Sequence, residues 1–480
     1  MKKLPRWLWL ACASEFVFAA GLAAAPAADK PNVVLIISDE IAYFEPGFMG
    51  GELIHTPNLD RLAASGVVMR HMLSGGANCA TARCTLITGK HLGHASVREN
   101  TGDIPIREDE TTIADVLKPL GYAVGGFGKW GVGGRGSTGV PEKHGFDVFF
   151  GYYDQVHAHT YYPPYLIRNS EEVWLPGNRG GLRGETYSQY VIHDEALAFI
   201  REHAGERPFF AYLPYTLPHG PFTIPDDDPA LDLYRDKPWP RDAVLYAAMT
   251  TLLDTHVGEI LELLEQTGVR DNTLVLFGGD NGGADRFASD EHPRGLFSGN
   301  KDPQGSTEYR GGKGNPYEGA FRVPFAVSWP SRIEPGRVSE HLGYFPDLLP
   351  TIAEACGAEI PAEVNGISIV PELIGDQAAG RPQEQHEYLY WERGAWTAIR
   401  RGDWRAVWTR RGGEWELYNL ADDPGESNNL ADQHPGLVAE LSALAREARV
   451  PARPGSYTSR DLTERDRRAK GGNVDRIPGD

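Results

Sequence analysis

The most informative segment of the chain is Pro31-Asn-Val-Val-Leu-Ile-Ile-Ser-Asp-Glu40. Its apolar run at 33–37 is unbroken and rich in β-branched residues, which favours a β-strand. A strand with one exposed face would alternate apolar and polar residues. The unbroken run therefore predicts a strand in the middle of a parallel sheet, with both faces covered. The polar residues 38–40 follow directly, at the end of this strand.

The rest of the chain alternates between strand-like and helix-like patterns. Apolar runs predict further strands at 122–127, 209–215 and 273–277. Apolar positions at helical spacing predict helices after Thr56, after Thr112 and at 243–264. This alternation is typical of an α/β fold, so we expect a large mixed, mostly parallel sheet flanked by helices.

The composition changes near Gly375, and residues 375–382 have the composition of a linker. Beyond them, short strands are predicted at 388–391, 396–400, 404–408 and 414–418, followed by a helix at 436–448. We therefore expect a main catalytic domain over residues 29–374 and a C-terminal subdomain over residues 384–450, built as a small antiparallel sheet with a packed helix. Residues 451–480 are polar and rich in Arg, Asp and Gly, which predicts a flexible tail.

Residues 1–28 have the pattern of a bacterial export signal. Lys2, Lys3 and Arg6 precede an apolar stretch at 7–22, and the alanine-rich residues 23–28 offer cleavage sites. An uncleaved membrane anchor is the alternative, but Glu15 interrupts the stretch, which is also short for a bilayer. We expect a periplasmic or secreted protein without a membrane span after cleavage.

The formal net charge of −19 limits the partners that the protein can bind. An acidic surface repels nucleic acid, so we exclude nucleic acid as a partner. An anionic substrate would need a local cluster of cations or a metal ion. Beyond the export signal the chain keeps Cys79, Cys84 and Cys356, so at least one cysteine is unpaired and a disulfide framework is excluded.

Two acidic clusters follow predicted strands. Asp39 and Glu40 come after the strand at 33–37, and Asp280 and Asn281 come after the strand at 273–277. The carboxyl ends of parallel strands meet at the edge where open α/β sheets bind ligands. Four oxygen-donating side chains suit a hard divalent cation, Ca²⁺ or Mg²⁺. The alternative for each cluster is an ordinary turn, in which Asp and Asn are common.

A third cluster is Cys79-Ala-Thr-Ala-Arg-Cys-Thr-Leu-Ile-Thr-Gly89. Gly89 is a natural helix end. If a helix begins near Cys79, Arg83 falls on the same face. The helix N-terminus would then direct free N–H groups at an anion beside Cys79, a candidate nucleophile. A buried core cysteine is the alternative.

Together these segments resemble the type I, formylglycine-dependent sulfatases of the alkaline phosphatase superfamily. The resemblance runs from Pro31 to about Ala431. It is carried, in chain order, by residues 31–39, Thr56-Pro-Asn-Leu-Asp-Arg-Leu62, Cys79-Ala-Thr-Ala-Arg83 with Leu86 and Thr88-Gly89, Gly128-Lys129-Trp130, Pro218-His219, Gly279-Asp280-Asn281-Gly282, Gly311-Gly312-Lys313 and residues 416–426.

The resemblance implies an arylsulfatase-like sulfuric ester hydrolase. Cys79 would be converted to Cα-formylglycine by a formylglycine-generating or sulfatase-maturing enzyme. One hydroxyl of the hydrated aldehyde would attack the sulfur of a bound sulfate ester, and deprotonation of the other would expel sulfate. By the same matching, Ca²⁺, or else Mg²⁺, would be bound by Asp39, Glu40, Asp280 and Asn281.

The resemblance also implies roles for cationic residues. Arg83 would anchor the formylglycine, while Lys129 and Lys313 would bind sulfate oxygens. His219 would contact the bridging oxygen and protonate the leaving alcohol. The alternatives are solvated surface lysines and a structural Pro-His turn.

Three positions depart from the family pattern. Thr81 stands where the nucleophile motif has Pro or sometimes Ala, at a position that helps the maturing enzyme recognise the cysteine. Glu40 stands where the metal site has a second Asp, and Gly131 stands where many members have His. Some members with this glycine carry a segment of the His-Ala-His type, and residues 157–159 form such a segment here. We therefore expect His159 to supply the missing base.

Aromatic residues gather around that segment: Tyr152, Tyr153, Tyr161, Tyr162 and Tyr165. Aromatic walls suit sugar rings or aryl groups, although core packing explains such a cluster as well. The long polar segment 284–310 is expected to set specificity. The favoured substrate is a sulfated glycan, with aryl sulfates as surrogates. The alternatives are a phosphodiesterase or phosphonate monoester hydrolase of the same superfamily, and a glycan-sulfate-binding protein that keeps the Cys79 thiol.

Overall fold

Strand β1 (Asn32–Ser38) lies inside a sheet of ten strands, and every one of its residues is buried. It pairs in parallel with β7 (Phe209–Pro214) on one side and with β8 (Thr273–Gly279) on the other. The structure is a computed structural model that describes residues 30–284, 286–291, 295–455 and 457–471. The predicted export signal lies outside these residues.

The main sheet has the strand order β10-β2-β9-β8-β1-β7-β3-β4-β5-β6. Its other members are β2 (Val67–Leu73), β3 (Ala123–Lys129), β4 (Val148–Tyr152), β5 (Tyr165–Arg168), β6 (Glu171–Trp174), β9 (Phe325–Ser328) and β10 (Arg337–Tyr344). The pairs that involve β9 or β5 are antiparallel, and the remaining pairs are parallel. The sheet is therefore mixed and mostly parallel, as predicted.

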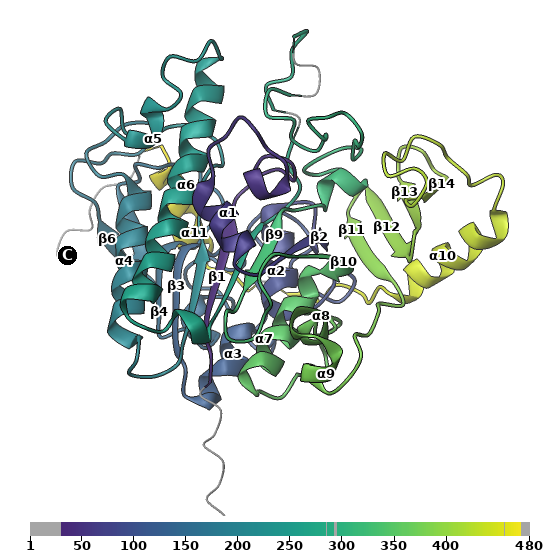
Figure 1. The fold of residues 1–480 in the computed structure, drawn as a ribbon, viewed down its shortest axis with the longest axis horizontal. Helices are drawn as coiled ribbons and strands as arrows, with labels where there is room; N and C mark the ends of the chain where they lie inside the picture. Colours follow the sequence, from purple (N-terminus) through teal and green to yellow (C-terminus); the bar gives the residue numbers. More distant parts are fainter. Residues whose placement is uncertain (1–29, 285, 292–294, 456, 472–480) are drawn as a thin grey trace, which may run out of the picture.

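Helices cover both faces of this sheet (Figure 1). Successive side chains of a strand point to opposite faces, and β1 accordingly contributes to two separate cores. Val34 and Ile36 pack with the helices α1 (Pro57–Ala64), α4 (Ser188–His203), α5 (Pro229–Asp232) and α6 (Arg241–Gln266). Val33, Leu35 and Ile37 pack with α2 (Cys79–Thr88), α3 (Ile113–Leu117), α7 (Leu348–Cys356) and α8 (Val370–Ile374). Burial on both faces explains the unbroken apolar run.

A second sheet follows, with the order β11 (Leu389–Arg393), β12 (Trp396–Arg401), β13 (Trp404–Thr409) and β14 (Trp415–Asn419). It is antiparallel, and α10 (Pro435–Glu447) packs on one of its faces. On the other side, the rings of Trp391 and Phe321 lie 4.7 Å apart and join the two sheets through a shared core. The predicted fold class is thus confirmed, including the smaller C-terminal sheet with its helix. Within the predicted linker, residues 376–379 form the short helix α9 (Asp376–Ala379).

The prediction of a flexible tail is wrong for residues 460–469, which form the helix α11 (Arg460–Ala469). Its Asp466 is fully buried and accepts hydrogen bonds from Arg135 at 2.6 and 3.0 Å and from Tyr165 at 2.9 Å. Figure 1 shows α10 at the right of the view and α11 at the left, among the elements of the main sheet. The tail therefore returns across the main domain.

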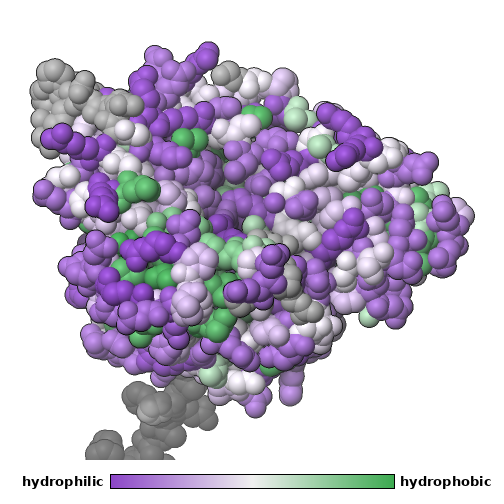
Figure 2. Space-filling view, turned by 90° about the horizontal axis from the view of Figure 1, so that it is seen from above, coloured by the Kyte–Doolittle hydropathy of each residue, from purple (hydrophilic) through white to green (hydrophobic). Residues whose placement is uncertain are grey.

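The surface in Figure 2 is hydrophilic over most of its area, and hydrophobic residues gather in separate patches. Among the described residues, no helix combines the length and the apolar character that crossing a membrane requires.

Candidate active site

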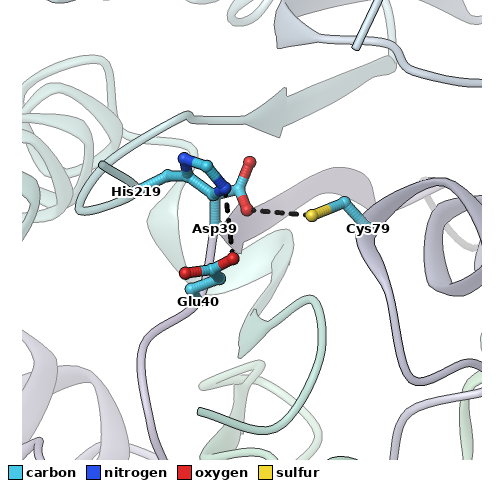
Figure 3. A group of neighbouring side chains, drawn as sticks. All are labelled: Asp39, Glu40, Cys79 and His219. Carbon is cyan, nitrogen blue, oxygen red and sulfur yellow. Dashed lines mark hydrogen bonds and ion pairs between the residues drawn. The ribbon is translucent and has the colours of Figure 1, made fainter. Parts of the chain in front are cut away.

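The carboxyl ends of the central parallel strands bring the predicted site residues to one edge of the sheet. Asp39 follows β1, Asp280 follows β8, and Lys129 is the last residue of β3. His219 lies in the loop after β7, and Cys79 is the first residue of α2. In Figure 3 the Cys79 side chain points from the start of its helix toward Asp39, with Glu40 and His219 on the other side of that carboxylate.

Cys79 is buried between a carboxylate and an ammonium group. Its Sγ lies 3.3 Å from Asp39 Oδ1 and 3.3 Å from Lys313 Nζ. Burial raises the pKa of the Cys79 thiol, and the carboxylates of Asp280 and Asp39 raise it further. The loop before α2 needs its glycines, because a Cβ at Gly75 would lie 2.0 Å from Thr85 Oγ1.

Arg83 lies one helical turn after Cys79 and is also buried. Its Nη2 donates to Asp280 Oδ2 at 3.0 Å and lies 3.5 Å from Asp39 Oδ2, and its Nη1 donates to the Lys129 carbonyl at 2.9 Å. Lys129 Nζ donates in turn to Asp39 Oδ2 at 2.6 Å. Burial lowers the pKa of Lys129, but the Asp39 carboxylate outweighs it and the pKa is raised. Burial would likewise raise the pKa of Asp39, yet Lys129, His219 and Arg83 hold it below its usual value.

Two of the four predicted metal ligands, Asp39 and Glu40, belong to a compact group of possible ligand atoms. The Glu40 amide donates to Asp280 Oδ1 at 3.2 Å, and single donor atoms of Asp39, Glu40, Cys79 and His219 lie within 4.8 Å of one another. Asn281 Oδ1 is buried and accepts no hydrogen bond from the described residues. Buried polar atoms are rarely left without a partner. Carboxylate and amide oxygens, such as those of Asp39, Glu40, Asp280 and Asn281, are ligands that a hard divalent cation prefers.

Glu40 also interacts with cations of the protein. Its carboxylate lies 3.1 Å from His219 Nε2 and forms ion pairs with Lys313 and Arg286. The Arg286 guanidinium lies over the rings of Phe222 and Tyr246. Sequence reasoning expected segment 284–310 to set specificity but did not single out Arg286, because no motif or strand end marks it.

The two histidines of the predicted site are stacked on each other. The rings of His159 and His219 have centroids 4.6 Å apart and an interplanar angle of 5°. His219 Nε2 lies 3.3 Å from Lys313 Nζ, and the Tyr161 hydroxyl donates to the His219 carbonyl at 2.7 Å. Burial lowers the pKa of His159 to about 3, assisted by the positive charge of Lys129.

Gly131 stands where many family members have His, and this difference is why His159 is expected to act as the base. The structure leaves no room for a side chain at Gly131. Its φ is 78°, and a Cβ there would lie 2.2 Å from the amide nitrogen of Gln155. Gln155 donates to the Gly131 carbonyl at 3.1 Å. A histidine at this position would have to displace Gln155.

Most of the aromatic cluster forms core rather than a binding wall. Tyr152, Tyr153, Tyr161 and Tyr165 are fully buried, which supports the alternative of core packing for these four. Tyr162 instead lines a cavity of about 580 Å³ together with Leu182, Tyr190 and Phe222. A neighbouring cavity of about 430 Å³ is lined by His159, Gly181, Leu182, Gly220, Pro221 and Lys470. Both volumes are in the range of small-molecule sites.

A model of the family described as Sulfatase matches residues 31–358. The chain belongs to the sulfatase family. As predicted, it is a sulfuric ester hydrolase. A second model, described as N-sulphoglucosamine sulphohydrolase, C-terminal, matches residues 312–447.

Named relatives and a solved structure agree with this membership. The chain is 29% identical to an N-acetylgalactosamine-6-sulfatase of Canis lupus familiaris, over 87% of this chain and 79% of the relative. It is 30% identical to arylsulfatase A of Bos taurus, over 90% of this chain and 88% of the relative. The crystal structure of Ps i-CgsB in complex with k-i-k-neocarrahexaose is similar with a TM-score of 0.75 and 26% identity, over 93% of this chain and 100% of the other.

Proposed function

We propose that this sulfatase removes sulfate from a sulfated carbohydrate, using a formylglycine derived from Cys79. The observation that carries the proposal is the position of Cys79 at the first residue of α2, with its Sγ 3.3 Å from both Asp39 Oδ1 and Lys313 Nζ. A reacting group at that position lies beside a carboxylate, an ammonium group and the N-terminal end of a helix, where the helix dipole is positive. Hydrated formylglycine there would provide a hydroxyl that attacks sulfur and a second hydroxyl through which sulfate is released.

Asp39, Glu40, Asp280 and Asn281 would hold a Ca²⁺ ion, with Mg²⁺ as the alternative. When bound, such an ion polarises a sulfate oxygen and lowers the pKa of the attacking hydroxyl. The unpartnered Asn281 Oδ1 supports this ligand set. Arg83 and Lys129 balance the carboxylates from the buried side and fix their orientation through the contacts at 2.6 to 3.0 Å.

The remaining residues would act on the ester itself. Lys313 Nζ lies between Cys79 Sγ and His219 Nε2, 3.3 Å from each, and would bind a sulfate oxygen. His219 Nε2 would give its proton to the leaving alcohol. His159, stacked behind it, would serve as the base that Gly131 does not supply. Lys129 would add positive charge to the sulfate pocket.

A sulfated glycan is the substrate class that the surroundings favour. Two neighbouring cavities share Leu182 and extend from His159 toward Tyr162 and Phe222. Their volumes of about 580 and 430 Å³ offer room for several sugar rings, more than a single aryl ring needs. The relatives, an N-acetylgalactosamine-6-sulfatase among them, support the same substrate class. The export signal of residues 1–28 and a maturing enzyme as partner complete the proposal.

The test is a pair of measurements on full-length protein made with a formylglycine-generating enzyme. Mass spectrometry of the peptide that contains residue 79 is expected to find the aldehyde. Turnover assays are expected to show faster release from sulfate esters than from phosphate mono- or diesters, and none from Cys79→Ala.

Other outcomes would replace the proposal. Faster hydrolysis of phosphate diesters would make the protein a phosphodiesterase of the same superfamily. A free thiol at residue 79, with glycan binding and no turnover, would make it a binding protein.

A further inference from the structure

We propose that Lys470, at the end of α11, binds a second anionic group of the glycan, either a sulfate or a carboxylate, on a sugar next to the one that carries the scissile sulfate. This inference rests on the proposed function and adds a charge requirement for the neighbouring sugar. Three features of the molecule support it: the path of the C-terminal segment 448–471, the contacts that fix α11, and the surroundings of Lys470.

The C-terminal segment lies beyond both family models, which end at residues 358 and 447. It leaves the small sheet and runs back over the main domain. The Val450 amide donates to the Gly93 carbonyl at 3.1 Å, and the Tyr457 carbonyl accepts from the Thr138 amide at 3.1 Å. The Arg107 guanidinium lies 3.6 Å from the centre of the Tyr457 ring. The segment is thus held at several points before α11 begins.

Polar contacts then fix α11 in one position. Its buried residues are Thr463, Asp466 and Ala469. Asp466 binds Arg135 and Tyr165, as described above, and Arg467 Nε donates to Asp154 Oδ2 at 3.1 Å. A charged group that is buried needs such partners. Because these contacts fix the helix rotation as well as its place, they also determine where residue 470 lies.

Residue 470 lies at the cavity beside the active site. Its carbonyl accepts from the Gly181 amide at 2.9 Å, and the residue lines the cavity that also contains His159 and Pro221. Thr160 Oγ1 donates to the Gly181 carbonyl at 2.7 Å, which ties the same loop to the segment of His159. An anion in this cavity would therefore lie near both His159 and Lys470.

Lys470 differs from the cations that lie within the active site itself. Lys129, Lys313, Arg83 and Arg286 each contact a carboxylate of the active site. Lys470 is exposed, and it forms no salt bridge with any residue in the part of the chain that the structure describes. In a protein of net charge −19, an ammonium group that is left available in a substrate cavity is suited to an anionic ligand.

The adjoining cavity carries charges of both signs, with three carboxylates and two guanidinium groups. It is lined by Glu185, Asp226 and Asp227 as well as by Arg183 and Arg241. Arg241 lies 3.8 Å from Asp226, so one of these cations already faces a carboxylate. Like charges repel, and a sulfated or carboxylated sugar would be disfavoured beside the acidic residues. The second anionic group should therefore lie on the Lys470 side of the scissile sulfate.

Three substrates and three variants test this assignment in the mature enzyme. The substrates are sulfated oligosaccharides of equal length whose neighbouring sugar is neutral, carries a second sulfate, or carries a carboxylate. The variants are Lys470→Ala, Lys470→Glu and the matched control Arg468→Ala. Arg468 is an exposed cation of the same helix, and two residues along a helix point to nearly opposite sides.

Loss of one exposed ion pair is expected to lower the preference for the anionic over the neutral substrate by about fivefold in Lys470→Ala, mainly through KM. Lys470→Glu should lower it further, and Arg468→Ala should leave it unchanged. Added salt should reduce the preference of the wild type more than that of Lys470→Ala. Whichever of the two anionic substrates shows the effect identifies the group that Lys470 binds.

Equal preferences in wild type and Lys470→Ala would overturn the inference while leaving the proposed function intact. Calorimetric titration of the Cys79→Ala variant with the same substrates measures binding without turnover. If the enzyme hydrolysed no sulfate ester, the proposed function would fail on its own. The assignment of Lys470 would then stand or fall on whether Lys470→Ala, in the Cys79→Ala background, weakens binding of the anionic oligosaccharides.

Discussion

His159 and His219 lie face to face, with ring centroids 4.6 Å apart and planes within 5° of parallel. His219 is the member of the pair that reaches the active-site cations and Glu40. At this distance two imidazolium rings would repel strongly, so at most one ring carries a positive charge. Proton transfer at His219 is therefore coupled to the charge of His159.

Two substitutions separate a base at His159 from a residue that merely holds the His219 ring. His159→Phe keeps an aromatic ring for stacking and removes the nitrogens, whereas His159→Ala removes both. If His159 acts as a base, both variants should lose at least about 100-fold in kcat. Wild-type turnover of His159→Phe in steady-state kinetics would leave His159 only a positioning role. His219→Ala, the reference variant, should lose activity whichever role His159 has.

Removal of divalent cations should reduce both activity and thermal stability. The ligands come from the ends of β1 and β8, which are buried strands, so an ion bound there stabilises the folded state. At a free Ca²⁺ concentration of about one hundred times its Kd, binding would add about 2.7 kcal/mol. Chelation should lower Tm, and added Ca²⁺ should restore it. Asn281→Ala, measured with and without Ca²⁺, should show a smaller shift. An unchanged Tm and undiminished turnover after chelation would contradict the ligand set.

The core of the fold could be predicted because it depends on apolar patterns. Residues 33–37 are buried on both faces of the sheet, as their unbroken apolar run predicts. Helix α11 could not be predicted in this way, because its buried face carries Thr463 and Asp466. Arg135, which binds Asp466, is 331 positions away from it in the sequence. Hydrophobic periodicity cannot predict an ion pair between residues that are so far apart in the sequence.

The residues of the site also divide into some that the sequence predicts and others that depend on tertiary contacts. Asp39 and Asp280 could be placed together because they follow predicted parallel strands, where the topology of the sheet determines their position, whereas Lys129 is named from the family resemblance. Arg286 and Lys470 come from segments without a strand end or a motif. Their positions depend on the path of long loops through tertiary contacts, which no local pattern specifies.

Thr81→Pro should increase the fraction of Cys79 that is converted to formylglycine. Thr81 is in the first turn of α2, where backbone N–H groups have no acceptor within the helix. Proline is tolerated there, and the change costs the Thr81 Oγ1 hydrogen bond to the Asn78 carbonyl. The measurement is the aldehyde fraction by peptide mass spectrometry, after expression with the same maturing enzyme. Thr81→Ser is the control and should not raise it. Equal fractions in all three proteins would show that residue 81 does not limit maturation.

The pair of Asp347 and His386 should make stability depend on pH. His386 Nε2 lies 2.7 Å from Asp347 Oδ1, and both side chains are buried. Burial lowers the pKa of His386, but the Asp347 carboxylate outweighs it and raises the pKa above the unfolded value of about 6.5. The stabilisation is thus fully present below about pH 6.5 and is lost as the pH rises through the folded-state pKa.

For a charge-assisted hydrogen bond we expect a loss of about 1 to 2 kcal/mol across this window. Urea unfolding between pH 5 and pH 9 measures it, with His386→Asn as the control variant. The two proteins should differ most at low pH and converge at high pH. A constant difference across the range would exclude this titration as the cause.

Asp466→Ala should release α11 without unfolding the main sheet. The substitution leaves the Arg135 guanidinium, whose side chain is 6% exposed, with Glu172 as its remaining carboxylate partner. Breaking a buried ion pair by removing one partner costs about 3 to 5 kcal/mol. Because α11 is joined to the domain by few apolar contacts, this cost should appear as local opening. Hydrogen exchange should become faster across residues 457–471 and stay slow in β1, β7 and β8. Glu464→Ala removes an exposed pair with Arg460 on the same helix and should change exchange little.

Release of α11 also displaces Lys470, so Asp466→Ala should show the same reduced substrate preference as Lys470→Ala. If the helix opens and the wild-type preference persists, the position of Lys470 on α11 does not determine that preference.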